Sequence, residues 1–134
     1  MNDHPMKYHP TYPTTHISET FKNYQEQAQT TAIYDKEVAL EYLASGIAGE
    51  VGELTSIIAK QLRKGNYSRG PGGTQNYYRY PINDIKHELG DVLWFVSQIA
   101  TTFQLDLADI ANSNIDKLAS RNVRGVIEGS GDYR

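Results

Sequence analysis

The chain has 134 residues, 13 Lys and Arg against 16 Asp and Glu, and no cysteine, which suits one globular domain with a core of its own. A net charge of −3 without a basic stripe argues against nucleic acid as a partner, and the lack of cysteine excludes disulfides and zinc–thiolate sites. Neither a secretory signal nor a run of eighteen apolar residues occurs, so we expect a cytoplasmic protein with no membrane partner.

The N-terminal part of the chain predicts an extended arm followed by two helices. Residues 1–17 are rich in Pro and His and show no apolar periodicity, which indicates an arm. Ser18 is a candidate N-cap for a first helix that runs to about residue 33. Helical periodicity then continues from Lys36 to Lys64, with basic residues at its end and Gly65 beyond, which predicts a long second helix.

The C-terminal half predicts a loop, two more helices and a tail. Residues 65–81 are rich in Gly and Tyr and form a loop of unusual length for a helix connection. Asn83 is a candidate cap for the third helix, which carries a strong apolar stripe to Phe103. Asp106 opens the fourth helix, Gly125 closes it, and residues 126–134 form a polar tail.

These elements predict an all-α fold. Strand alternation, internal repeats and heptad arrays are missing from the sequence, so we expect an antiparallel bundle of about four helices with a long central hairpin. The domain should span residues 18–125. The second and third helices carry more apolar surface than a chain of this length needs for its own core, so we expect oligomerisation to complete the bundle.

Two acidic pairs stand at spacing i, i+3 inside apolar runs: Glu50 with Glu53, and Glu88 with Asp91. Residues three apart share one helix face, so each pair directs both carboxylates the same way. A solvated helix face is the simpler explanation, but the flanking apolar residues place both pairs toward the buried side. Two like charges about 6 Å apart repel by about 3 kcal/mol at an effective dielectric of about 20, and a divalent cation would offset this repulsion.

Carboxylate oxygens alone favour Mg²⁺, with Mn²⁺ as a possible substitute, over zinc. A di-iron bundle is the nearest alternative, but it requires a Glu-x-x-His motif, and no Glu in this chain has His three residues later. The sequence therefore predicts a magnesium site made by four carboxylates on two helices.

Further candidates lie on the third and fourth helices. Asn114, Lys117 and Arg121 fall on one stripe of the fourth helix, where they could bind anionic oxygens, although a solvated outer face would have the same pattern. Trp94 follows Asp91 by three residues and could stack on a nucleotide base, but a core position is the favoured interpretation.

Together these motifs resemble the signature of the MazG-like branch of the all-α nucleoside triphosphate pyrophosphohydrolases. The similarity extends from the acidic motifs to the first helix, to the segment from Gly90 to Trp94, to Asn114-x-x-Lys117-Leu-x-x-Arg121, and to the tail from Arg124 to Arg134. It covers roughly residues 18–134, which is more than one short motif would cover by chance. One departure is the separation of Glu53 and Glu88 by 34 residues, because residues 65–81 lengthen the connection.

The resemblance implies an Mg²⁺-dependent enzyme that hydrolyses ribo- or deoxynucleoside triphosphates between the α and β phosphates, giving a nucleoside monophosphate and pyrophosphate. It implies metal binding by the four acids and catalysis by Glu50 and Glu53, with Glu53 as the general base. It also implies a homodimer or homotetramer with a shared nucleotide pocket. The implied substrate-binding residues are Asn114, Lys117, Arg121, Trp94, Asp132 and Arg134.

Two alternatives stay open on the sequence alone. One is another phosphoanhydride substrate, such as a guanosine alarmone or a damaged nucleotide, because no residue of the chain defines a base preference. The other is a non-enzymatic helical interaction module, whose acids bind a structural ion or a basic partner. A structural ion would raise thermal stability without nucleotide, whereas a catalytic Mg²⁺ would bind weakly until substrate is present.

Overall fold

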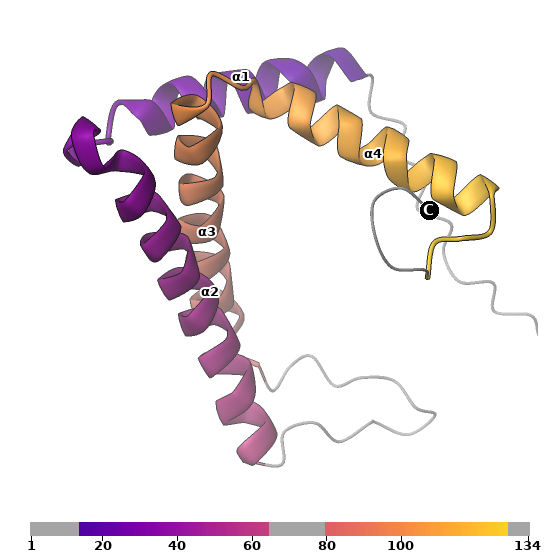
Figure 1. Cartoon of the computed structure of the whole chain (residues 1–134). Helices are drawn as coiled ribbons and strands as arrows, with labels where there is room; N and C mark the ends of the chain where they lie inside the picture. Colours follow the sequence, from indigo (N-terminus) through magenta and orange to yellow (C-terminus); the bar gives the residue numbers. More distant parts are fainter. Residues whose placement is uncertain (1–13, 65–79, 129–134) are drawn as a thin grey trace, which may run out of the picture.

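The structure is a computed structural model that describes residues 14–64 and 80–128. Within these ranges the chain forms four α-helices, α1 (Thr14–Gln29), α2 (Ala39–Arg63), α3 (Ile82–Thr102) and α4 (Leu107–Val123), and no strand (Figure 1). The predicted all-α class is confirmed. No helix among the described residues is long and apolar enough to cross a membrane.

The first helix has different limits from those predicted. It begins at Thr14, so Ser18 lies inside it and does not cap it, and residues 14–17 are helical rather than extended. It ends at Gln29, before the expected residue 33, because two threonines divert its last carbonyls. The amide and the hydroxyl of Thr30 both donate to the Gln27 carbonyl, and those of Thr31 both donate to the Ala28 carbonyl.

The second predicted helix is divided near its start. Lys36–Val38 form a short 3₁₀ helix, labelled η1, in which the Asp35 carboxylate accepts a hydrogen bond from the Glu37 amide at 2.9 Å. The α-helical geometry begins only at Ala39 and continues without interruption to Arg63. The capping aspartate thus starts a tighter turn before the long helix, a common use of 3₁₀ geometry at helix N-termini.

The caps of the last two helices were predicted with mixed success. Asn83 does not cap α3, because the helix already begins at Ile82 and the Pro81 carbonyl accepts the Ile85 amide at 3.0 Å. Asp106 does cap α4, accepting the amides of Ala108 at 2.7 Å and Asp109 at 3.4 Å. Gly125 closes α4 with φ of 68°, a left-handed conformation that glycine adopts at little steric cost.

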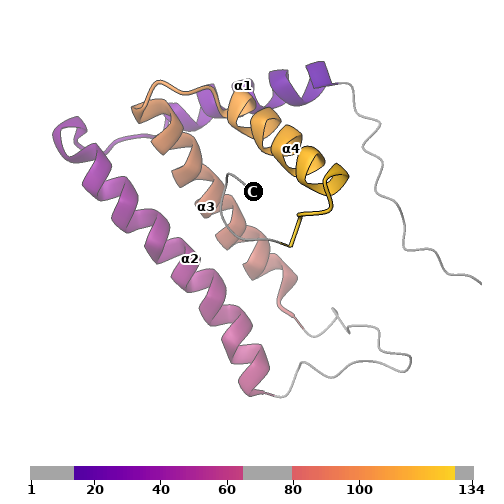
Figure 2. The same ribbon diagram turned by 45° about the vertical axis from the view of Figure 1, so that its right-hand side comes forward.

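α2 and α3 lie side by side and run in opposite directions, forming the predicted central hairpin (Figures 1 and 2). α1 crosses one end of this hairpin, and α4 packs mainly along α1 and to a smaller extent against α3. In both views α3 lies between α2 and α4. The buried apolar side chains of the described residues are Ala28, Ala39, Leu43, Phe95, Ala100, Leu107 and Ala108.

Gln25 joins three helices through its side-chain amide. Its Nε2 donates to Thr101 Oγ1 at 3.0 Å and to the Leu105 carbonyl at 2.9 Å, and its Oε1 accepts the Leu107 amide at 2.8 Å. The Leu107 amide is in the first turn of α4, where backbone donors have no partner within the helix. Gln25 therefore completes the N-terminal cap that Asp106 begins.

Replacing Gln25 with Ala should lower the free energy of unfolding by about 1–3 kcal/mol, because it leaves the Leu107 amide and the Leu105 carbonyl without their partner. Urea denaturation at fixed chain concentration measures this change. Glu26→Ala, an exposed position on the same turn, is the matched control and should change stability little. Equal stability of the two variants would show that the Gln25 side chain does not stabilise the α1–α4 junction.

Candidate metal centre

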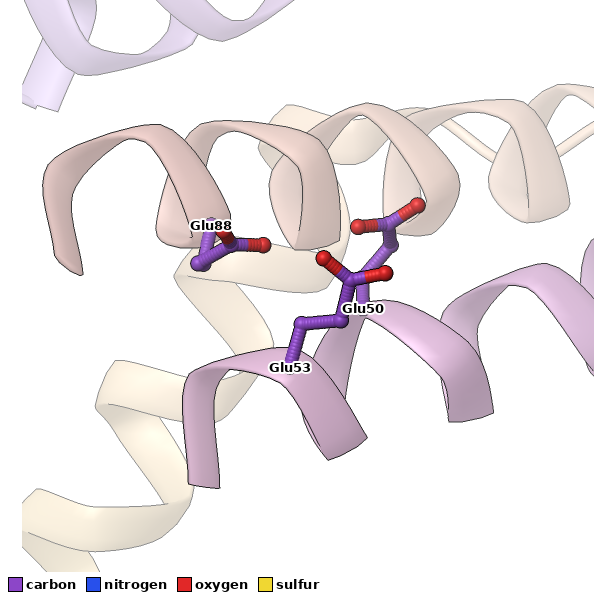
Figure 3. Close-up of side chains that lie close together, drawn as sticks. All are labelled: Glu50, Glu53 and Glu88. Atoms are coloured by element: carbon purple, nitrogen blue, oxygen red, sulfur yellow. The ribbon is translucent and has the colours of Figure 1, made fainter. Parts of the chain in front are cut away.

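Three carboxylates meet between the two helices of the hairpin. Glu50 and Glu53 project from α2 and Glu88 from α3, and one oxygen of each lies within 4.8 Å of the others (Figure 3). Glu50 and Glu88 are half-buried, whereas Glu53 is exposed. The group is thus open to solvent on one side and backed by the two helices on the other.

A close contact one turn away sets the approach of the two helices. A Cβ atom at Gly46 would overlap the Phe95 ring, so only glycine allows α2 and α3 to come this near. Gly46 precedes Glu50 by one helical turn, and Phe95 follows Glu88 by two. The Gly46–Phe95 contact therefore places the α2 and α3 carboxylates within reach of a common ion.

The electrostatics of the group are those of clustered like charges. Partial burial raises the pKa of Glu50, and the negative charges of Asp91, Glu53 and Glu88 raise it further. All three neighbours that act on Glu50 therefore carry the same sign of charge. Hard oxygen donors and a concentrated negative field are what Mg²⁺ or Mn²⁺ requires of a site.

Asp91 is placed differently from the other three acids. It is not part of the group whose oxygens lie within 4.8 Å of one another, and its side chain is exposed. Its charge nevertheless acts on Glu50, and it also contributes to raising the pKa of Tyr24 on α1, after burial. Asp91 is thus close enough to both Glu50 and Tyr24 to act on them electrostatically, without being a member of the three-glutamate group.

The raised pKa of Glu50 makes a prediction about pH. In the interval between the ordinary carboxyl pKa and the raised one, the folded state holds more protons than the unfolded state, so metal-free stability should fall as pH rises. Glu50→Gln should make this fall shallower, and Mg²⁺ should oppose it by binding the ionised form. Thermal melts of both proteins across this interval, with and without Mg²⁺, test the prediction. An unchanged slope in Glu50→Gln would contradict it.

The predicted phosphate-binding stripe on α4 is split by the structure. Asn114 and Lys117 line an open hollow of about 630 Å³ beside the start of α4, together with Asp106, Asp109 and Ser113. Arg121 is only 5% exposed, which a fully solvated outer face does not explain. Asp132 and Arg134, the remaining polar candidates, lie outside the described residues.

Trp94 belongs to an aromatic group at the α1 end of the hairpin. Its indole nitrogen donates to Thr31 Oγ1 at 2.8 Å, and its ring meets those of Phe95 and Tyr34 edge to face, with centroids 5.0 and 6.2 Å apart. Tyr42 stacks on Tyr34 at 5.1 Å. These contacts join the segment before α2 to α3. The packing of Trp94 in this group fits the core interpretation only in part, because the Trp94 side chain is half-buried and not buried.

Sequence reasoning assigned no role in the site to Tyr24. Its half-buried side chain lies near enough to Asp91 for the carboxylate to raise its pKa. The sequence carries only a partial signal for Tyr24, because its near-helical spacing from Phe21 and Ala28 does not show which part of the molecule it contacts.

Sequence similarity to known proteins shows the family of the chain. The family model described as the MazG nucleotide pyrophosphohydrolase domain matches residues 39–125. The chain belongs to the MazG family. Gene 37 protein of Mycobacterium phage L5 is 38% identical over 117 residues, which span 83% of this chain and 96% of that protein. No solved structure matches the chain.

The MazG match contains every element that carries a predicted metal-binding side chain. It begins at the first residue of α2 and ends just after α4, so the three clustered glutamates, Asp91 and the α4 stripe all fall within it. α1, which carries Gln25 and Tyr24, precedes the match. α1 therefore packs against α3 and α4 of the matched range while lying outside that range itself.

Proposed function

We propose that this MazG-family protein hydrolyses nucleoside triphosphates between the α and β phosphates, giving a nucleoside monophosphate and pyrophosphate. The observation that carries the proposal is the convergence of Glu50, Glu53 and Glu88 within 4.8 Å from two helices. Three like charges at this distance repel one another in the metal-free fold, and a bound cation would offset that repulsion. Family membership supplies the nucleotide as the class of substrate.

The donor set suits Mg²⁺, with Mn²⁺ as a possible substitute. Glu50, Glu53 and Glu88 would hold the ion, and Asp91 would add negative charge beside it or bind after a change of rotamer. When bound, the ion would polarise the α-phosphoryl group and lower the pKa of a water molecule. The partly open face of the group leaves room for phosphate oxygens.

Among the chain's own residues, Glu53 is our candidate for the general base. It is the most exposed of the three clustered carboxylates, so one of its oxygens can face a water molecule that the other two acids do not reach. The water oxygen forms a bond to the α phosphorus, its proton passes to Glu53, and the bond from the α phosphorus to the bridging oxygen breaks. Pyrophosphate leaves with the bonding electrons, and no covalent enzyme intermediate is needed.

The phosphate and base contacts are proposed from the sequence motifs. Asn114 and Lys117 are exposed on α4 and offer an amide and an ammonium group to anionic oxygens. Arg121, Asp132, Arg134 and Trp94 complete the proposed substrate contacts. We also propose that the active form is a homodimer or homotetramer in the cytoplasm, with the nucleotide bound between subunits.

The test is product analysis across all ribo- and deoxynucleoside triphosphates with Mg²⁺. Phosphorus NMR should show a nucleoside monophosphate and pyrophosphate, and omission of Mg²⁺ should abolish both. Release of inorganic phosphate and a diphosphate would place cleavage at the wrong bond and refute the mechanism. If no triphosphate gives a product, the remaining functions are hydrolysis of an alarmone or a damaged nucleotide, and a non-enzymatic binding module.

A further inference from the structure

Asp91 stands apart from the three clustered glutamates, although it follows Glu88 by only three residues on α3. Its side chain is exposed, and its negative charge acts on two groups, the Glu50 carboxyl on α2 and the Tyr24 phenol on α1. The glutamates repel Asp91, because all four groups carry the same sign of charge. A hydrogen-bond donor on another side of Asp91 would oppose this repulsion and set the direction of its carboxylate.

Tyr24 and Asp91 lie on sides of their helices that face each other. Ala28 follows Tyr24 by four residues and Thr31 follows Ala28 by three, so the three share one side of this segment. Ala28 is 7% exposed, so this side of α1 packs on the rest of the molecule. On α3, Trp94 follows Asp91 by three residues, and its indole nitrogen donates to Thr31 Oγ1 at 2.8 Å. The side of α1 that carries Tyr24 is therefore directed at the side of α3 that carries Asp91.

The backbone beside Tyr24 is fixed in the same interface. The side chain of the next residue, Gln25, donates to Thr101 Oγ1 at 3.0 Å and accepts the Leu107 amide at 2.8 Å. Together with the bond between Thr31 and Trp94, these contacts hold the segment to α3 at two places. A side chain that starts from a fixed backbone can orient a neighbouring group with little loss of conformational entropy.

The phenol of Tyr24 is suited to donate a hydrogen bond. Partial burial raises the pKa of Tyr24, and the negative charge of Asp91 raises it further. A raised phenol pKa keeps the hydroxyl protonated, and a protonated hydroxyl donates to a carboxylate in a strong, charge-assisted hydrogen bond. Tyr24 thus offers Asp91 a donor without bringing a charge of its own to the carboxylate group.

Other donors on the same side of α3 are less suited to this task. The N–H of Trp94 is already donated to Thr31. Gln98 follows Asp91 by two helical turns, about 10 Å along the axis, and is fully buried. His87, one turn before Asp91, is exposed, so water competes with it for the carboxylate. The half-buried phenol on α1 is the donor that a neighbouring helix brings to this position.

We propose that Tyr24 is a positioning residue of the metal centre: its hydroxyl donates to one oxygen of the Asp91 carboxylate and turns the other oxygen toward the ion held by the three glutamates. Partners of this kind orient the groups that bind a metal and raise its affinity. The inference rests on the proposed function for the metal site, and it assigns a part in metal binding to α1, which precedes the MazG match.

Mn²⁺ binding to the full chain without nucleotide tests the proposal apart from activity. Electron paramagnetic resonance measures the free Mn²⁺ that remains at each metal concentration. Tyr24→Phe keeps the ring and removes the hydroxyl, so Mn²⁺ affinity should fall about 10- to 100-fold. Tyr42→Phe removes a hydroxyl from a ring that stacks on Tyr34, and this control should bind Mn²⁺ like the wild type. Wild-type affinity in Tyr24→Phe, or an equal loss in Tyr42→Phe, would overturn the proposal.

A double-variant cycle shows whether Tyr24 acts through Asp91. Asp91→Ala should also weaken Mn²⁺ binding, and adding Tyr24→Phe to it should cause little further loss, because the phenol then has no carboxylate to orient. Additive losses would overturn the proposal in favour of two independent effects. His87→Ala should leave Mn²⁺ affinity near the wild-type value. A loss in His87→Ala that Tyr24→Phe does not show would assign the orienting bond to His87 and overturn the proposal too.

Pyrophosphate release separates this inference from the proposed function. In Tyr24→Phe the Mg²⁺ concentration for half-maximal release should rise by about the factor by which Mn²⁺ affinity falls, and saturating Mg²⁺ should restore most of kcat. A loss of kcat that saturating Mg²⁺ does not restore would overturn the positioning role. If the wild type binds Mn²⁺ but releases no pyrophosphate from any nucleoside triphosphate, the proposed function fails, and the Mn²⁺ affinities still decide for or against the role of Tyr24.

Discussion

Glu88→Gln is expected to lower kcat/KM for nucleoside triphosphate hydrolysis by at least about 100-fold, because it removes the one carboxylate by which α3 joins the group with Glu50 and Glu53. The loss should not come from unfolding. Relief of repulsion among three clustered carboxylates should leave the metal-free melting temperature unchanged or higher. Pyrophosphate release at saturating Mg²⁺, with thermal melts of both proteins, measures the two effects.

Glu41→Gln is the matched control for this result. Glu41 is exposed in the first turn of α2, outside the carboxylate group, so its neutralisation should leave turnover near the wild-type value. If Glu88→Gln retains wild-type activity, Glu88 is not a ligand and the proposed three-glutamate centre is wrong. Glu53→Gln tests both roles proposed for that residue, since full activity in that variant would refute Glu53 as the base and as a metal ligand.

Gly46→Ala should have the largest effect on stability of any single methyl group added to the described glycines. The new Cβ would overlap the Phe95 ring, which is held between Trp94 and Tyr42 by aromatic contacts. Such overpacking should lower the free energy of unfolding by about 1–3 kcal/mol. Because the same contact sets the approach of α2 to α3, activity should fall as well. Urea denaturation and pyrophosphate release, at equal chain concentration, measure both.

The neighbouring glycine supplies the control. No heavy atom lies within 4 Å of a Cβ built at Gly49, so Gly49→Ala should raise the free energy of unfolding by about 0.5–1 kcal/mol through helix propensity. Truncating Phe95 to Val in the Gly46→Ala background should recover part of the lost stability if the two side chains collide. A Gly46→Ala protein as stable as the wild type would show that the helices are farther apart than described.

Helix capping shows where sequence reasoning succeeds and fails. Asp106 and Gly125 were assigned correctly because a cap side chain and a left-handed residue lie directly at the two ends of the helical pattern. Ser18 and Asn83 were wrong because Ser and Asn have the capacity to cap wherever they occur, and here the backbone was already helical before each of them. The predicted end of α1 was wrong for a similar reason. Thr30 and Thr31 give no sign of a helix end in the sequence, and only the structure shows that their hydroxyls donate to the carbonyls of Gln27 and Ala28.

The sequence by itself determined what depends on neighbours along the chain: the helical class, the central hairpin, and the two acidic pairs that each share a helix face. These features arise from a period of about 3.6 residues, which every helix keeps whatever surrounds it. Only the tertiary structure decided that Glu50, Glu53 and Glu88 meet while Asp91 lies beside them, and that Arg121 is buried while Lys117 is exposed. Those outcomes depend on how each helix is rotated about its axis, and rotation is set by contacts between distant residues, such as Gly46 with Phe95 and Gln25 with Leu107.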